Sequence, residues 1–272
     1  MAQVLAVPGD VRHGFSYKGK FNHDFSRITG IAATMKGNLL LCDHNKKNLI
    51  LVDPLGNYFK KLDVDSEPYE VVIISQNIGC ITQPNSKCVV QIDPDRMIVL
   101  FKTTCDELNT TLSCVSALPN TGRISQGKNH FQQHCRDLSK WIYNLFTCCK
   151  VPCSQRQLFL FLYGQNYITY KTYSSGYPTM MNIATMDTPT DRCSDDNGHI
   201  YVSGQDSNNI HRLVNYITKL PFGAKSDCKV IDIPLDSQHG IKEPVALCFN
   251  KDYSKLYIVN EWGKSVLVFD AI

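Results

Sequence analysis

The sequence predicts an all-β protein: a β-propeller of nominally six blades, each a four-stranded antiparallel sheet. Two observations lead to this prediction, a block of sequence that recurs at least three times and a spacing of about 40 residues between copies. In each copy a short apolar strand is followed by a polar loop and a second apolar strand. Such a unit cannot bury its apolar face alone, so the copies must stack on one another.

The recurring block has strand chemistry rather than helix chemistry. Its clearest copies begin their first strands at Leu39, Ile200 and Leu256, and in each the next strand begins ten residues later. The runs are rich in β-branched and aromatic residues and are bounded by Gly, Asn and Asp, which is typical of strands. Paired-helix repeats of this period would need longer windows that are apolar at i, i+3, i+4 and i+7.

The spacing between copies gives the number of blades. A weaker copy begins at Gly79, one repeat length after Leu39, and Ile200 follows three further repeat lengths along the chain. A last and longer step leads from Ile200 to Leu256. Counting these steps gives six blades, two of them inferred from spacing alone. We therefore expect one domain over residues 1–272.

Composition and charge favour a cytoplasmic globular protein. The 272 residues are 43% apolar, and the net charge of +3 is too small to indicate nucleic-acid binding by itself. The first eight residues lack the basic start and apolar length of a secretory signal, and the longest apolar run is far too short to span a bilayer. Many of the 12 cysteines lie inside apolar runs, as buried thiols do in a reducing compartment.

The block at residues 30–57 resembles an NHL repeat, in which a glycine-apolar segment leads into two strands that each end in Asp. Residues 198–210 and 243–270 look similar. Over residues 20–104 and 193–272 the chain resembles the C-terminal propeller of tripartite-motif (TRIM) proteins, particularly those of bivalve type. This resemblance implies an interaction module, the substrate- or RNA-selecting end of a ubiquitin ligase.

Two features depart from that family. A RING finger, B-boxes and a coiled coil would precede the propeller, but no paired Cys/His zinc spacing of that kind occurs before residue 130. Ligase activity would therefore have to come from elsewhere. Residues 106–190 lack the Gly-Asn strand starts, and no acidic residue lies between Asp137 and Asp187. This stretch is either a pair of divergent blades or an insertion of doubtful fold.

The predicted binding surface consists of loops that surround one mouth of the central channel. In blades of this type the loop between the second and third strands opens there, as does the connection to the next blade. Loops on a rigid ring are where binding residues concentrate. The expected partner-binding residues are lysines, asparagines and aromatic residues of these loops: Lys46, Lys47, Tyr69, Lys87, Asn208, Asn209, Lys242, Trp262 and Lys264.

The chemistry of these loops suits more than one partner. Cationic and aromatic side chains together fit an acidic peptide, or single-stranded RNA whose bases stack on rings. We expect a protein partner, with single-stranded RNA as the alternative, and neither a membrane nor a small-molecule cofactor. A structural interpretation stands beside the functional one, because turn Lys and Asn are commonly only solvated and Trp262 either packs locally or meets a partner.

The sequence predicts neither a catalytic site nor a bound metal. One cluster has ligand chemistry but poor spacing for tetrahedral zinc, namely His134, Cys135, Cys148, Cys149 and Cys153. No nucleotide-binding or serine-hydrolase motif occurs.

Two further groups of polar residues have side chains that could act in acid–base catalysis or bind a metal ion. Asp43 and His44 are adjacent at a strand end, where an Asp is expected to accept hydrogen bonds from turn amides. The alternative function is that of a calcium-dependent propeller hydrolase of the lactonase or esterase type, which needs several oxygen ligands in the channel. Glu70 and Asn260 are the candidates near the channel mouth.

Overall fold

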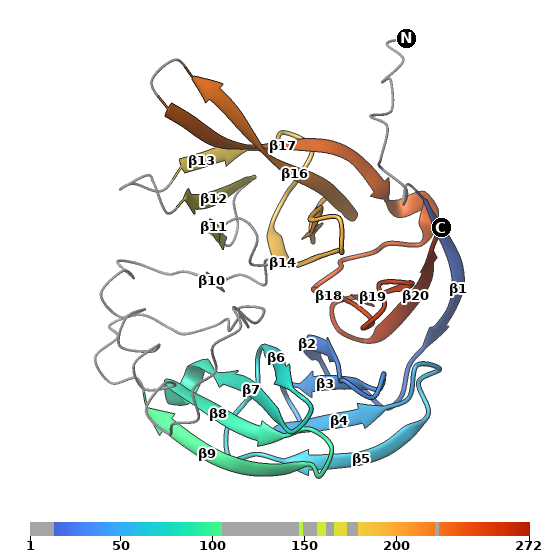
Figure 1. Ribbon diagram of the computed structural model, residues 1–272. Coiled ribbons are helices and arrows are strands. Elements are labelled where there is room, and N and C mark those ends of the chain that lie inside the picture. The colour runs from blue at the N-terminus through green and yellow to red at the C-terminus, as the bar shows by residue number, and fades with distance from the viewer. Residues whose placement is uncertain (1–13, 105–146, 149–156, 162–165, 173–178, 221–222) are drawn as a thin grey trace.

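The computed structural model describes residues 14–104, 147–148, 157–161, 166–172, 179–220 and 223–272. These residues form five four-stranded antiparallel sheets around a common axis, which confirms the predicted β-propeller (Figure 1). Two short 3-10 helices are the helical elements among them, η1 (Pro84–Ser86) and η3 (Ser237–His239). Within this part of the chain no helix has the length and apolar character needed to cross a membrane.

The two N-terminal sheets run outward from the axis in chain order (Figure 1). The β2–β5 sheet consists of β2 (Ile28–Ala33), β3 (Leu39–Asp43), β4 (Asn48–Val52) and β5 (Tyr58–Asp63). The β6–β9 sheet consists of β6 (Val71–Ser75), β7 (Ile78–Gln83), β8 (Cys88–Asp93) and β9 (Ile98–Thr104). Both sheets match copies found in the sequence.

Two further sheets follow in the chain. The β10–β13 sheet consists of β10 (Thr147–Cys148), β11 (Gln157–Phe161), β12 (Tyr167–Thr172) and β13 (Thr179–Asn182). The β14–β17 sheet consists of β14 (Pro189–Ser194), β15 (Ile200–Gly204), β16 (Asn209–Leu220) and β17 (Gly223–Leu235). The sequence spacing places two inferred blades between Gly79 and Ile200. β11 lies where the second of these blades is expected, and the place of the first lies outside the described residues.

The C-terminal sheet joins the two ends of the chain. Its strands β18 (Ala246–Phe249), β19 (Lys255–Asn260) and β20 (Ser265–Ala271) are completed by β1 (Phe15–Phe21), which pairs antiparallel with β20. The repeat does not predict this closing strand, because residues 15–21 belong to no copy of the block. The long step from Ile200 to Leu256 is explained by β16 and β17, which are 12 and 13 residues long and project as a hairpin (Figure 1).

Apolar residues are buried between neighbouring sheets rather than in one central core. Leu39 and Leu41 of β3 pack toward Tyr257 of the C-terminal sheet, while Leu40 packs toward Ile81 of the β6–β9 sheet. Both faces of β3 are therefore buried, which explains why its apolar residues are consecutive instead of alternating. Each such side chain contributes about 1.5–3 kcal/mol on burial.

Candidate functional site

The turns between second and third strands are each four residues long in four sheets. They comprise residues 44–47, 84–87, 205–208 and 261–264. In three of them the last residue adopts the left-handed conformation, with φ of 52° at Lys47, 51° at Lys87 and 53° at Asn208. These three predicted site residues therefore occupy equivalent places in three sheets.

Asp43 holds the first of these turns against the connection that enters its own sheet. Its carboxylate accepts hydrogen bonds from the N–H groups of Ser26 (3.0 Å), Lys46 (3.3 Å) and Arg27 (3.4 Å), and from the Ser26 hydroxyl. The expectation that Asp43 accepts turn amides is confirmed. His44 instead lies at the surface, with Nδ1 3.0 Å from Oδ1 of Asn45.

The last residues of β7 and β19, like Asp43 at the end of β3, bind the connection that enters their own sheet. The Gln83 amide donates to the Asp65 carboxylate and to the Ser66 carbonyl, at 3.1 Å in both cases. The Asn260 side chain accepts from the N–H of Lys242 at 2.8 Å. Asn260 is thus buried, and its side chain is held by the connection that enters its own sheet.

Three of the predicted site residues are joined in one hydrogen-bonded unit where the β14–β17 sheet meets the C-terminal sheet. The Glu243 N–H donates to Oδ1 of Asn208 at 2.8 Å, and the Trp262 N–H donates to the Glu243 carbonyl at 3.1 Å. The Glu261 N–H donates to the Lys242 carbonyl at 2.7 Å. Residues distant in sequence are therefore held as one surface.

An open hollow of about 510 Å³ lies on this unit. Asn208, Lys242, Glu243 and Glu261 line it, so its wall carries both signs of charge. Glu243 and Glu261 adopt the left-handed conformation, with φ of 44° and 53°. Non-glycine residues in this conformation cost of order 1–3 kcal/mol and persist only where surrounding contacts fix them.

A second group of predicted residues gathers around the connection between β5 and β6. Lys47 Nζ lies 3.0 Å from Oε1 of Glu67, and the Asn85 amide donates to the other oxygen at 3.2 Å. A backbone hydrogen bond at Glu67, helped by these two side chains, lowers the pKa of its carboxyl to about 2. The Tyr69 ring stands edge-on to His44, with centroids 6.3 Å apart.

Acidic residues offset the positive charge that the lysines suggest. Lys46 Nζ pairs with the Asp24 carboxylate at 2.6 Å, as Lys47 does with Glu67, and Lys20 pairs with Glu261 at 2.5 Å. Exposed pairs of this kind add little to stability because solvent screens them, yet they cancel much of the local positive charge. The face is therefore mixed in charge rather than cationic. The predicted residues Lys87, Lys242 and Lys264 are exposed on it.

Trp262 is partly covered from within the chain. The guanidinium carbon of Arg27 lies 4.9 Å from the centre of its ring, a cation–π contact worth about 0.5–1 kcal/mol at an exposed site. The side chain remains 37% exposed. Local packing therefore accounts for part of the ring, and contact with a partner stays a prediction for the rest.

The channel mouth itself is narrow and polar. Arg27, Thr29, Tyr69, Glu70 and Gln205 line a hollow of about 20 Å³, which has room for roughly one water molecule. Glu70 lies at the mouth as expected and is buried. Within the described ranges, no group of three or more His, Cys, Asp or Glu side chains is placed to hold a metal ion.

Asn209 lies beneath the loop surface. Its amide donates to the Thr185 carbonyl at 3.0 Å and accepts from the Ser207 hydroxyl at 2.9 Å. The side chain is buried, so its observed contacts are structural. Nothing in the sequence distinguishes it from the half-buried Asn208, because the two are adjacent in one polar turn.

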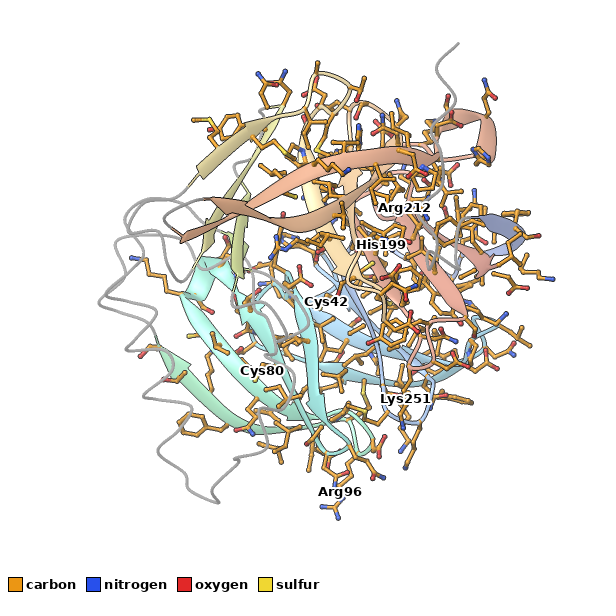
Figure 2. All side chains as sticks on the ribbon, turned by 45° about the horizontal axis from the view of Figure 1, so that its top comes forward. Cys42, Cys80, Arg96, His199, Arg212 and Lys251 are labelled. Carbon is orange, nitrogen blue, oxygen red and sulfur yellow. The ribbon has the colours of Figure 1, made fainter. Side chains whose placement is uncertain are left out.

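The cysteines that lie in apolar runs are buried thiols. Cys42, Cys80 and Cys248 are each within the sheets, and Figure 2 shows the first two there. Burial raises the pKa of the Cys80 thiol to about 12, which keeps it protonated and unreactive. Four members of the zinc candidate lie outside the described residues: His134, Cys135, Cys149 and Cys153.

No protein-family model matches the chain, and neither does any curated protein sequence. Solved structures do. Virginiamycin B lyase from Staphylococcus aureus matches with a TM-score of 0.55 and 13% identity, over 95% of this chain and 100% of that one. A catalytically inactive variant of that lyase, solved with quinupristin, gives 0.58 and 14% over the same shares. A structural genomics protein from Bacteroides thetaiotaomicron gives 0.60 and 10%, over 94% and 73%.

The chain is a β-propeller. At these identities the likeness establishes the fold alone. It does not distinguish the NHL type from other propellers, so that finer resemblance stays a prediction.

Proposed function

We propose that this β-propeller is a non-catalytic interaction module that binds a protein on its loop face. The observation that carries the proposal is the hydrogen-bonded unit of Asn208, Lys242, Glu243 and Trp262 beside the open hollow of about 510 Å³. A surface held in place before binding loses little conformational freedom when a partner docks. An exposed Trp beside such a hollow is the kind of anchor that dominates protein interfaces.

A protein suits this face better than RNA does. Carboxylates of Asp24, Glu67 and Glu261 lie among the lysines and pair with them. A nucleic-acid backbone would meet these negative charges, whereas a protein can present both signs. Single-stranded RNA remains the alternative that the experiment must separate.

The resemblance of the strand blocks to NHL repeats supports a more specific role. In that role the propeller selects substrates for a TRIM-type ubiquitin ligase, with the ligase domains supplied by another polypeptide segment. The cytoplasm is the compartment that buried cysteines outside disulfides, such as Cys80, favour.

An enzymatic role has weaker support. The channel-mouth hollow of about 20 Å³ is far below the ~300–1,000 Å³ of ordinary small-molecule sites. Glu70 is the described carboxylate that lines it, whereas a calcium-dependent hydrolase would need several oxygen ligands there. Calorimetric titration with calcium tests that alternative directly.

The proposal is tested by capturing partners from cell extract with the full chain. The double variant Trp262→Ala, Lys264→Glu alters the face without touching the buried bonds of Asp43 or Asn260. Loss of an anchoring Trp typically costs at least ~2 kcal/mol, so capture should fall about 30-fold. The matched control is Tyr58→Ala, Lys251→Glu, which changes an exposed aromatic and an exposed lysine away from this face.

Equal capture by the double variant and the unaltered chain would contradict the loop face as the binding surface. Crosslinking followed by nuclease treatment then separates the two kinds of partner. A complex that survives nuclease is a protein complex, and one that is lost requires RNA.

A further inference from the structure

The turn between β14 and β15 contains an Asn-Gly pair, Asn197 and Gly198. Asparagine is chemically labile, because the backbone nitrogen of the next residue can attack its side-chain amide and close a five-membered ring. Glycine at the next position favours this reaction, since it has no side chain to obstruct the approach and its backbone is the most permissive. Every other asparagine in the sequence is followed by a bulkier residue.

The local structure leaves this reaction unobstructed. The Asn197 side chain is exposed, and among the described residues its amide has no hydrogen-bond partner. Gly198 has φ of 81°, and a Cβ atom placed on it would have no atom within 4 Å beyond its chain neighbours, so the ring has room to form. The Gly198 N–H donates to the Asp195 carbonyl at 3.3 Å, longer than the usual distance of about 2.9–3.0 Å. Little is therefore lost when this nitrogen reacts.

The same turn binds a buried carboxylate. Oδ1 of Asp195 accepts hydrogen bonds from the N–H groups of Asn197 and His199, both at 2.9 Å. Oδ2 accepts from the Tyr201 hydroxyl at 3.1 Å and lies 2.9 Å from Nδ1 of His199. Asp195 is only 1% exposed, so water does not readily replace a lost donor. The backbone on both sides of the Asn-Gly bond is therefore bound to a single carboxylate oxygen.

We propose that Asn197 is a site of spontaneous deamidation and isomerisation in the folded chain. The Gly198 nitrogen, after losing its proton to hydroxide, bonds to Cγ of Asn197. The bond from Cγ to the side-chain nitrogen breaks, and this nitrogen takes a proton from water and leaves as ammonia. Water then opens the succinimide. Attack at Cγ restores the normal backbone with aspartate, and attack at the backbone carbonyl carbon gives isoaspartate.

The two products should differ in their effect on the turn. In isoaspartate the chain runs through Cβ and Cγ, so one extra carbon separates the N–H of residue 197 from that of His199. The two groups then cannot both keep their places on Oδ1 of Asp195. Loss of one hydrogen bond to this buried charge should raise the equilibrium constant for unfolding about tenfold or more. This turn lies at the opposite end of β15 from the loop face, so the proposal is independent of the proposed function.

Incubation of the full folded chain at mildly alkaline pH, followed by peptide mass spectrometry, tests the modification. The peptide that contains residue 197 should gain one mass unit, and isoaspartyl methyltransferase should label its isoaspartate fraction. Asn85 is the internal control and should stay unchanged, because its amide donates to Glu67 and its successor is Ser86. Asn197→Gln should abolish the change, since the longer side chain would have to close a six-membered ring.

Urea denaturation of the aged chain tests the consequence. The isoaspartate form, isolated by chromatography, should unfold at lower urea concentration than Asn197→Asp, which has the same charge and a normal backbone. Deamidation that occurs only when the chain is unfolded in urea would show that the turn protects Asn197, and would overturn the proposal. An isoaspartate form as stable as Asn197→Asp would overturn the role assigned to the two N–H groups.

Discussion

The β2–β5 sheet and the β14–β17 sheet fix their incoming connections with residues from opposite sides of the turn. In the first, Asp43 at the end of β3 binds the N–H groups of Ser26 and Arg27. In the second the equivalent residue is Gly204, and the connection is held by Asn209 at the start of β16, whose amide donates to the Thr185 carbonyl. Both sheets thus hold the incoming connection by a side-chain hydrogen bond, although they use different residues.

The two residues of the β14–β17 turn depend on each other. A Cβ atom at Gly204 would lie 2.3 Å from Oγ of Ser207 and 2.7 Å from Oδ1 of Asn209. Real Cβ atoms do not approach other atoms so closely, so the Asn209 arrangement requires glycine at 204. A side chain at position 204 would therefore displace the side chains of Ser207 and Asn209, so a carboxylate there would compete with the Asn209 arrangement.

Removing the Asp43 carboxylate from the β2–β5 turn should cause the largest loss in the free energy of unfolding. Asp43→Ala leaves three N–H groups and a hydroxyl without their acceptor at a buried position. Unsatisfied buried groups that had charged partners cost about 3 kcal/mol in the free energy of unfolding. Urea denaturation measures this loss. Asp53→Ala, in a more exposed turn, is the control, and an equal loss in both variants would refute the role assigned to Asp43.

Placing an aspartate at position 204 of the β14–β17 sheet, where the β2–β5 sheet has Asp43, should cause an intermediate loss in the free energy of unfolding. Gly204→Asp forces the side chains of Ser207 and Asn209 to move, and overpacking of this kind costs about 2 kcal/mol. If the two residues are coupled, adding Asn209→Ala should cost less in the Gly204→Asp background than it does in the native chain. Strictly additive losses of unfolding free energy would show that a carboxylate at position 204 and the Asn209 arrangement can coexist.

The fold was predictable where the sequence repeats its chemistry. Leu39, Ile200 and Leu256 lie in second strands of three sheets, as the recurring apolar runs and their spacing indicate. The sequence does not predict the closing strand β1, because an outermost, exposed strand needs few apolar residues. Its two lysines further interrupt the apolar pattern that marks a strand. Its partner β20 is also far away in the chain, so no local pattern joins them.

The arrangement of the proposed binding face was predictable, but the mixed charge of that face was not. The loops that carry Lys47, Asn208 and Trp262 follow from the repeat, and contacts join several of them. The ion pairs of Asp24 and Glu261 do not follow from the repeat. Asp24 lies before the first copy of the block, and the lysine that pairs with Glu261 lies at the other end of the chain. Ion pairs between distant segments depend on how the sheets close into a ring, which a local sequence pattern does not record.

The last expected effect concerns pH and a second residue of the β14–β17 arrangement. His211 also contacts this connection, with Nε2 2.9 Å from the Thr185 hydroxyl, at a place where the C-terminal sheet has the buried Leu267. Burial lowers the pKa of the His211 ring from 6.5 to about 4. The unfolded chain therefore takes up a proton at higher pH than the folded chain does.

It follows that the contribution of His211 is fully present above pH 6.5 and is lost as the pH falls toward 4. The loss is at most about 1.4 kcal/mol per pH unit, and it is smaller where the ring is not fully dehydrated. His211→Leu, which copies the C-terminal sheet, should remove this dependence. Unfolding free energies measured at several pH values should run parallel for the native chain and the variant on the alkaline side and diverge on the acidic side, the native chain losing more. Curves that stay parallel throughout would mean that the His211 ring takes up its proton as easily inside the β14–β17 sheet as in the unfolded chain.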